Sequence, residues 1–320
     1  MGTTLLLGAA NVAAAPLRRA VPPQVWPGRL HRLMWADGHC AIELGALTDA
    51  REILPCLSVR SAAAWGYQCT LEYATASGHS GRTALDPVGA FAAAASSDST
   101  EAVAAAIDVL RIREPLQRAT LHLRVQGIDA RAPALLSVSI RDHGAAPSPV
   151  ATGPGTAIAV PPRSQMVLRA DLASHVCSPT SVAMLLDYYG HSTDIYELIA
   201  AARHQPSGLY GVWPANIHAA AQRGPMGYLL HFPTWEAARA LLDAGLPIIA
   251  SVRYEEGELR DAAIRRTNGH LLVLRGYDGD KVLVNDPAAK TDPEVKRSYD
   301  LAEFCRVWLG NSAVGYVLYE

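Results

Sequence analysis

The first half of the chain is dominated by short segments in which apolar and polar residues alternate. Residues 65–73 are interpreted as one strand, and clear alternation occurs at residues 120–126 and 136–141. Alternation with a period of two is typical of β-strands that bury one face. Gly127 and Pro133, between the last two segments, supply turn residues. Several short strands of this kind predict a β-sandwich-like unit.

The second half begins with helical periodicity. Four apolar residues recur at helical spacing: Val182, Leu185, Leu186 and Tyr189. Ser178 is suited to cap a helix here, and Pro179 suits its first position. Gly190 suits the left-handed residue that follows the last turn. The pattern therefore predicts a helix that ends before Gly190 and places Cys177 immediately ahead of its N-terminus.

Further along the chain, helical segments precede strands. We expect helices at residues 195–202, 215–223 and 235–244, the last of them capped by Thr234. We expect strands at residues 248–254, 270–277, 282–285 and 314–319. Helices first and strands later are typical of an α+β unit.

Residues 142–162 separate these two patterns. They are rich in proline and glycine, which do not suit a regular element. We therefore place a domain boundary here, with a β-rich sandwich-like domain at residues 1–158 and an α+β domain at residues 159–320. The length of 320 residues agrees with two domains of ordinary size.

Two segments of the first half allow more than one interpretation. Residues 1–16 contain an apolar run and small residues that resemble a signal peptide, but the first positive charge, Arg18, follows the run instead of preceding it. A buried first strand is the alternative, so the sequence leans only weakly towards export. Residues 100–110 are rich in alanine, which favours a helix, yet they also allow a strand near Val109.

The composition and the charge of the chain argue against several classes of binding partner. Half of the residues are hydrophobic, 18% are charged, and the net charge is −2. No basic run is present, which argues against nucleic acid as a partner, and no apolar run is long enough for a transmembrane span. The five cysteines are sparse and lack CxxC spacing, so they indicate neither a disulfide framework nor a zinc site. No phosphate-binding loop is present, and we expect no cofactor and no metal.

Cys177 is the first candidate for chemistry. The N-terminus of a helix carries partial positive charge, which favours a thiolate over a thiol, and a thiolate attacks carbonyl carbon atoms. The alternative is a buried structural cysteine, the commoner role of a lone cysteine. His175 could imitate a catalytic base, but near neighbours in an extended segment rarely converge, so we interpret it as a residue of the cleft rim.

His270 and Asp286 are candidate partners for such a thiolate. They occupy two successive predicted strands that are joined around residues 278–280. A three-residue loop would place both side chains on one face of the sheet, whereas a two-residue loop would place them on opposite faces. The interpretation therefore requires a three-residue loop, with Gly279 or a neighbour in the left-handed conformation.

A histidine and a carboxylate on one face supply what a thiol nucleophile needs. The imidazole removes the thiol proton and later protonates the leaving amine, and the carboxylate fixes the tautomer of the imidazole. The alternative is that His270 is a buried histidine with satisfied hydrogen bonds and that Asp286 is a turn residue. Trp213 and Asn216 leave a similar choice between lining a substrate groove and filling the core.

Four segments of the second half resemble, in the same order, motifs of the papain-like cysteine peptidases of the bacteriocin-leader-processing (double-glycine peptidase-like) family. They are residues 160–166, 177–181, 268–276 and 285–288. The resemblance covers residues from about 160 to 320 and implies a papain-like cysteine peptidase domain. The first half resembles, more faintly, the β-rich domain that precedes the peptidase domain in some bacterial relatives.

The resemblance also implies a role for each candidate residue. Cys177 would be the nucleophile, His270 the general base and Asp286 the residue that orients His270. Gln165 would donate its side-chain N–H, together with the backbone N–H of Cys177, to the oxyanion of the tetrahedral intermediate. The implied activity is hydrolysis of a peptide bond in a peptide or protein substrate through a thioester acyl-enzyme.

Two other functions are compatible with the same residues. An acyltransferase would form the same acyl-enzyme and intercept it with an amine instead of water. A binding module would retain the fold with a blocked cleft, although the presence of nucleophile, base and carboxylate argues against that. No ATP-binding segment accompanies the motifs, so the chain is not expected to be a complete leader-processing exporter.

Overall fold

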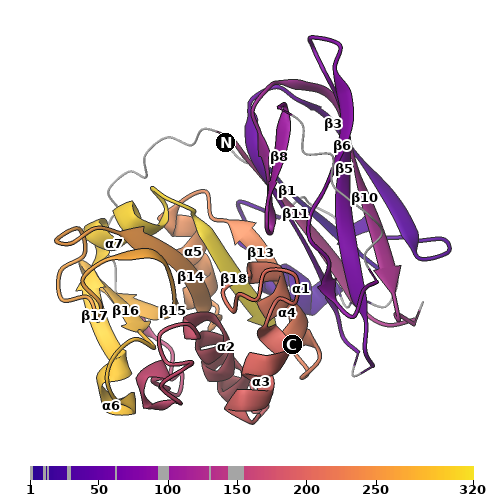
Figure 1. Cartoon of the computed structure of the whole chain (residues 1–320). Coiled ribbons are helices and arrows are strands. Elements are labelled where there is room, and N and C mark those ends of the chain that lie inside the picture. Colours follow the sequence, from indigo (N-terminus) through magenta and orange to yellow (C-terminus); the bar gives the residue numbers. More distant parts are fainter. Residues whose placement is uncertain are drawn as a thin grey trace.

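The computed structural model describes residues 3–9, 12, 14–26, 30–61, 63–92, 101–129, 131–142 and 155–320. The described residues form three β-sheets, with most of the helices in the second half of the chain. Figure 1 shows the strands of the first half side by side with the mixed helices and strands of the second half. None of the helices in these ranges is long and apolar enough to cross a bilayer.

The first half contains two of the sheets. The first has the order β2 (His31–Arg32), β1 (Thr3–Gly8), β11 (Ala134–Asp142), β4 (Ala50–Val59), β9 (Val109–Ile112) and β8 (Val103–Ala106). The second has the order β3 (His39–Leu47), β10 (Leu116–Gln126), β5 (Gly66–Thr75) and β6 (Ser80–Ala84), with β7 (Val88–Gly89) beside β5. Buried side chains of both sheets, such as Leu57 and Leu121, belong to one hydrophobic core.

The strands predicted at residues 65–73, 120–126 and 136–141 are confirmed: the first overlaps β5 from Gly66 onwards, and the other two lie within β10 and β11. Of residues 100–110, which allowed either a helix or a strand, residue 100 lies outside the described residues, and residues 103–110 contribute to the β8–β9 hairpin. Residues 3–8 form β1, which pairs with β11, in agreement with the interpretation as a buried first strand.

The second half contains the third sheet and its helices. The strand order is β13 (Met226–His231), β18 (Val314–Tyr319), β14 (Ile248–Tyr254), β15 (Thr267–Asp278), β16 (Lys281–Asn285) and β17 (Lys296–Asp300), with β12 (Thr156–Ala157) beside β15. The helices are α2 (Cys177–Tyr188), α3 (Ile195–Ala202), α4 (Trp213–Ala221), α5 (Trp235–Asp243), α6 (Asp292–Val295) and α7 (Leu301–Trp308), and a 3₁₀ helix spans Gln165–Val167. The remaining helix, α1 (Ala14–Arg19), comes from the first half.

Helices α3 and α5 and strand β14 agree closely with the prediction, and the hydroxyl of Thr234 caps α5 by accepting from the backbone N–H of Ala237. The predicted cap of α2 is wrong. The N-cap is Val176, which has no side-chain cap hydrogen bond, and Cys177 is itself the first helical residue. The Ser178 hydroxyl is instead hydrogen-bonded to the Tyr316 hydroxyl, 2.9 Å away, and the helix begins two residues earlier than predicted.

The first sheet packs directly against β13, the edge strand of the third sheet. Three serine hydroxyls accept hydrogen bonds from alternate N–H groups of β13: Ser58 from Gly227 at 3.1 Å, Ser137 from Leu229 at 3.3 Å, and Ser139 from His231 at 2.9 Å. An unpaired sheet edge exposes a row of backbone donors and acceptors. Here the other half of the chain satisfies the donors, so the two halves meet in a hydrogen-bonded interface.

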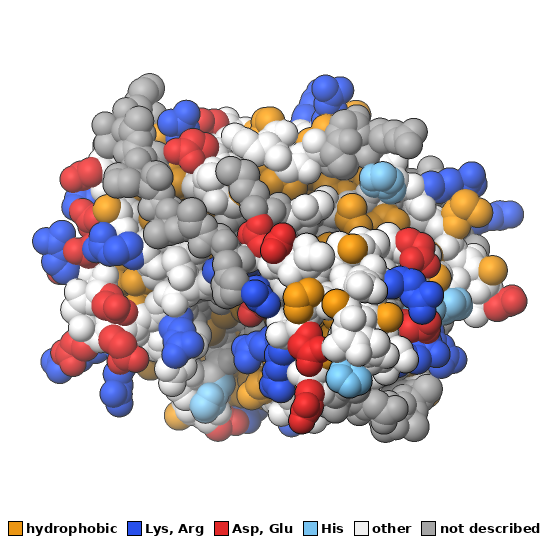
Figure 2. Space-filling view, turned by 90° about the horizontal axis from the view of Figure 1, so that it is seen from above, with side chains coloured by type: hydrophobic (Ala, Val, Ile, Leu, Met, Phe, Trp, Pro, Cys, Tyr) orange, Lys and Arg blue, Asp and Glu red, His pale blue; other side chains and the backbone are white. Residues whose placement is uncertain are grey.

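The proposed domain boundary falls after β11, at the start of the third sheet. Residues 143–154, within the proline- and glycine-rich break, lie outside the described residues. Strand β12 pairs with β15, so Thr156 and Ala157 already belong to the third sheet. Figure 2 shows acidic and basic side chains interspersed on one face of the molecule, in keeping with the net charge of −2.

Candidate active site

Cys177 lies at the N-terminus of α2, partly exposed to solvent. Helix α2 is anchored behind it, because the Ser181 hydroxyl donates to the carbonyl of Leu271 on β15 at 3.2 Å and residues 178–186 are buried. The sulfur atom therefore projects from a rigid element towards the strand that carries His270.

His270 is buried on β15, with 3% of its surface exposed. Its Nε2 donates to Oδ1 of Asp286 at 2.8 Å. Its imidazole lies close enough to the thiol of Cys177 for each group to shift the pKa of the other. Because Nε2 is occupied by the carboxylate, Nδ1 is the ring nitrogen that can exchange a proton with the sulfur.

The loop that joins β15 to β16 differs from the prediction. Asp278 pairs with Lys281, so the loop holds two residues and the predicted three-residue loop is wrong. Gly279 does adopt the left-handed conformation, with φ of +54°. With this loop alone, His270 and Asp286 would face opposite sides of the sheet.

A β-bulge restores the common face. Leu274 pairs with Val284, whereas Gly276 pairs with Leu283, so β15 carries Arg275 as an extra residue at this point. One inserted residue reverses the alternation of side chains for the rest of the strand. The two-residue loop and the bulge each reverse the alternation of side chains relative to the prediction. Their effects therefore cancel, and His270 and Asp286 lie on one face.

The carboxylate of Asp286 is completely buried and has two further donors. The backbone N–H of Ala288 donates to Oδ1 at 3.0 Å, and the hydroxyl of Tyr299 donates to Oδ2 at 2.7 Å. Tyr299 was not foreseen. It comes from β17, a strand that showed no clear alternation, so nothing in the sequence placed its hydroxyl beside Asp286.

The three groups shift one another's protonation. Burial raises the pKa of Cys177, but the hydrogen bond and charge of His270 and the N–H groups of Leu271 and Ser178 outweigh it, so this pKa is lowered. Burial lowers the pKa of His270, but the charge and hydrogen bond of Asp286 prevail and raise it. Burial also raises the pKa of Asp286, but the charge of His270 and the hydrogen bonds hold it below its usual range. The site therefore favours a thiolate, an imidazolium and a carboxylate.

The other cysteines differ from Cys177 in this respect. All five are free thiols. Burial raises the pKa of Cys69 and of Cys305 to about 12, and it also raises the pKa of Cys40 and of Cys56. Only Cys177 among the five has a lowered pKa, which is the condition of a reactive thiol.

Gln165 lies in the segment that precedes α2 and is buried. Its backbone N–H donates to the carbonyl of Pro287 at 2.8 Å, which ties it to the residue that follows Asp286. Its side-chain Nε2 donates to the carbonyl of Ala173 at 2.7 Å, and its Oε1 has no hydrogen-bond partner among the described residues. One of the two Nε2 hydrogens is thus occupied, and the other is available to a ligand.

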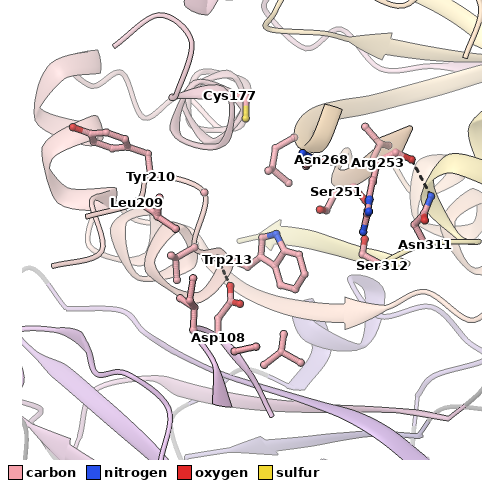
Figure 3. A pocket seen from close by; sticks show the side chains of 18 of the residues that line it. Asp108, Cys177, Leu209, Tyr210, Trp213, Ser251, Arg253, Asn268, Asn311 and Ser312 are labelled. Atoms are coloured by element: carbon pink, nitrogen blue, oxygen red, sulfur yellow. Dashed lines mark hydrogen bonds between the residues drawn. The ribbon is translucent and has the colours of Figure 1, made fainter. Parts of the chain in front are cut away.

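Cys177 lines a cavity of about 900 Å³. Figure 3 shows its sulfur at one end, with Trp213, Arg253 and Asp108 around the space beyond it. His175 also lines the cavity, as the rim interpretation expects, and so does Trp213. Asn216 does not. It is buried, and its side-chain N–H groups donate to the carbonyls of Tyr210 and Val212, which shapes the loop ahead of α4.

The described residues contain no group of three or more His, Cys, Asp or Glu side chains arranged to hold a metal ion.

Comparison with solved structures gives two similar chains. A double-glycine-motif protease from an AMS/PCAT transporter, in complex with its leader peptide, has 17% identity and a TM-score of 0.34, over 51% of this chain and 97% of that one. The peptidase domain of Streptococcus ComA, a bi-functional ABC transporter involved in quorum sensing, has 18% identity and a TM-score of 0.33, over 46% of this chain and 92% of that one. No curated protein matches the chain.

The sequence itself matches a known family over residues 157–316, which is half of the chain. The matched segment contains Gln165, Cys177, His270 and Asp286, together with five of the seven strands of the third sheet in full. The protein belongs to the Peptidase_C39 like family.

Proposed function

We propose that the protein is a cysteine peptidase that hydrolyses peptide bonds with Cys177 as nucleophile, His270 as general base and Asp286 as the residue that orients His270. The observation that carries the proposal is the buried hydrogen bond between the imidazole of His270 and the carboxylate of Asp286, beside the thiol of Cys177 that lines a cavity. Membership of a peptidase family supports the same conclusion.

In the first step, the Cys177 thiolate attacks the carbonyl carbon of the scissile bond, while the imidazole of His270 retains the proton. Negative charge develops on the carbonyl oxygen. The backbone N–H of Cys177, free at the N-terminus of α2, and the second Nε2 hydrogen of Gln165 are the proposed donors to this oxyanion. Loss of one such donor typically costs about 2.7–4 kcal/mol of transition-state stabilisation.

In the second step, the imidazolium of His270 gives its proton to the leaving amine, and the C–N bond breaks to leave a thioester on Cys177. A water molecule then attacks the thioester, with His270 as the base, and the thiolate is released with the carboxylic acid product. Throughout, the carboxylate of Asp286 holds the Nε2 proton and stabilises the imidazolium.

We also propose the finer description of the fold, with a sandwich-like domain at residues 1–158 followed by a papain-like domain at residues 159–320, in which the short strand β12 at the end of the first domain pairs with β15 of the second. The shared core of the first two sheets supports the former. The helix that begins at the cysteine, packed against the strand that carries the histidine, supports the latter.

The proposal is tested by digestion of a peptide library with the native chain and with the Cys177→Ala and His270→Ala variants, read by mass spectrometry. Cleavage by the native chain alone is the expected result.

Iodoacetamide labelling provides a second readout, because Cys40 is also partly exposed and serves as an internal control. Cys177 should label faster than Cys40, and the difference should disappear in His270→Ala. Equal labelling of the two thiols, with no cleavage, would overturn the proposal. Amide-linked products on addition of an amine would indicate acyl transfer instead.

A further inference from the structure

The cavity that holds Cys177 is built from both halves of the chain. The β8–β9 hairpin of the first half contributes the two residues of its turn, Ile107 and Asp108. The second half contributes Leu209, in the loop after α3, and Trp213, at the start of α4. The volume of about 900 Å³ lies near the upper end of the range for ligand-binding clefts, roughly 300–1,000 Å³.

Ile107 is unusual in conformation. It occupies the left-handed region, with φ of +59°, although the position is one of two loop residues in a hairpin, where glycine or asparagine is favoured. A β-branched residue in this region is strained, and such strain often accompanies function. The side chain is also 37% exposed although it is large and apolar. It fills no core, and it faces the cavity.

The hairpin is held firmly against the other half. The carboxylate of Asp108 accepts a hydrogen bond from the backbone N–H of Trp213 at 3.0 Å, which caps α4 from the opposite half of the chain (Figure 3). Hydrogen bonds also shape the loop that carries Leu209, whose carbonyl accepts from the N–H of His204 at 2.9 Å. Leu209 is 49% exposed. Two exposed aliphatic side chains and an indole are thus preorganised around one end of the cavity.

We propose that Ile107, Leu209 and Trp213 form an apolar subsite that receives a large aliphatic or aromatic side chain of the peptide substrate, so that the first half of the chain determines specificity. The inference rests on the proposed peptidase function, because it assigns the subsite to the substrate of Cys177. Water leaves these apolar surfaces when such a side chain binds, which favours binding in proportion to the area buried.

The test uses alanine-based acetylated peptides in which a single leucine or phenylalanine is moved along the sequence. The native chain should cleave best when the large residue occupies one particular position relative to the scissile bond. Ile107→Gly should lower kcat/KM for that peptide by roughly tenfold, as expected for loss of part of an apolar pocket, and should lower it much less for the all-alanine peptide, whose side chains do not fill the subsite. Ile107→Leu is the matched control that keeps an apolar side chain and should retain the preference.

The variant is informative because glycine relieves the strain at φ +59°. The melting temperature of Ile107→Gly should therefore be unchanged or higher, so a loss of selectivity cannot be attributed to unfolding. The rate of Cys177 alkylation should also be unchanged. An unaltered preference for the large residue in Ile107→Gly would overturn the inference.

A second set of measurements distinguishes failure of the proposed peptidase function from failure of the proposed subsite. If the native chain cleaves none of the peptides, the same set is used in binding measurements with the Cys177→Ala variant, with and without Ile107→Gly. Tighter binding of the leucine peptide than of the alanine peptide, abolished by Ile107→Gly, would support the subsite even without hydrolysis. Equal binding of both peptides would overturn it.

Discussion

At the scale of single residues, the chemistry depends on which of three groups holds each proton. The pKa of Cys177 is lowered and that of His270 is raised, so the thiolate–imidazolium pair exists between the two values. Peptide cleavage should rise as pH passes the Cys177 pKa and fall as pH passes the His270 pKa, because the leaving amine needs the imidazolium proton. Alkylation of Cys177 needs only the thiolate and should rise without falling.

Asp286→Asn provides the first prediction. The negative charge of Asp286 is what raises the pKa of His270 against the effect of burial. Its removal should move the alkaline limb of kcat/KM to lower pH and reduce kcat by about 10²–10⁴-fold, the range of general acid–base catalysis. Steady-state kinetics over the full pH range measure both effects. An alkaline limb that stays in place would show that another group sets the imidazole pKa.

Tyr299→Phe is the second prediction. The variant removes the hydroxyl that donates to Oδ2 of Asp286, and a hydrogen bond to a charged group typically contributes about 1.5–3 kcal/mol. We expect the pKa of Asp286 to rise and the carboxylate to be held less firmly, with kcat reduced and KM unchanged. Tyr254→Phe is the matched control, because this buried tyrosine hydroxyl donates to the carbonyl of Ile264 instead. Equal kinetics for the two variants would exclude a positioning role for Tyr299.

At the scale of elements, the β-bulge in β15 decides whether the site exists. Gly276 adjoins the bulge, with φ of +154°, and a Cβ atom there would lie 1.9 Å from the carbonyl oxygen of Thr156 on β12. Alanine cannot be accommodated without moving one strand or altering the bulge. Because the bulge sets the face on which His270 lies, a local change at residue 276 acts on a side chain six residues away along the strand.

Gly276→Ala is therefore the third prediction. We expect a loss of stability above the roughly 1–3 kcal/mol of a strained conformation alone, accompanied by a loss of activity. Chemical denaturation and peptide cleavage measure the two. Gly279→Ala is the control: its φ is +54°, but no atom lies within 4 Å of the added Cβ. A Gly276→Ala variant as stable and active as Gly279→Ala would show that the bulge tolerates the side chain.

The elements also show what sequence patterns can predict. Periodicity located α3, α5, β14 and the strands around residues 121 and 138, because each has one clearly apolar face. The bulge was not predictable, because a strand that is buried on both faces shows no alternation of apolar and polar residues that an extra residue could interrupt. Helix α7 was not predicted, although Asp300 and Glu303 have the spacing of a capping box, and the Asp300 carboxylate does accept from the N–H of Glu303.

The chemically active residues of the candidate site were predictable from the sequence, but the hydrogen bonds that hold them in place were not. Cysteine, histidine, aspartate and glutamine stand in motifs that can be read along the chain. The contacts of Asp286 with Tyr299 and of Trp213 with Asp108 join residues that are far apart in sequence, or come from elements without a clear pattern. Such contacts follow only from the packing of the three sheets.

At the scale of the whole molecule, the two halves are parts of one structure. A single hydrophobic core includes Leu54 and Leu135 of the first sheet and Tyr228 and Leu230 of β13, and both halves line the cavity at Cys177. The first half therefore contributes stability to the third sheet and shape to the cleft. A fragment that contains the third sheet alone would expose the apolar face of β13 and its free N–H groups.

Ser137→Ala is the last prediction. The Ser137 hydroxyl accepts from the N–H of Leu229 on β13, and both residues are completely buried. A buried donor left without a partner costs about 1–3 kcal/mol, so the free energy of unfolding should fall by that amount, measured by urea denaturation of the full chain.

Ser298→Ala changes an exposed serine on β17 and should alter stability by about 0.5 kcal/mol or less. Because the donor belongs to the third sheet and the acceptor to the first, a larger effect at Ser137 would show that folding of one half depends on the other. Equal effects of the two substitutions would mean that the halves are stabilised independently.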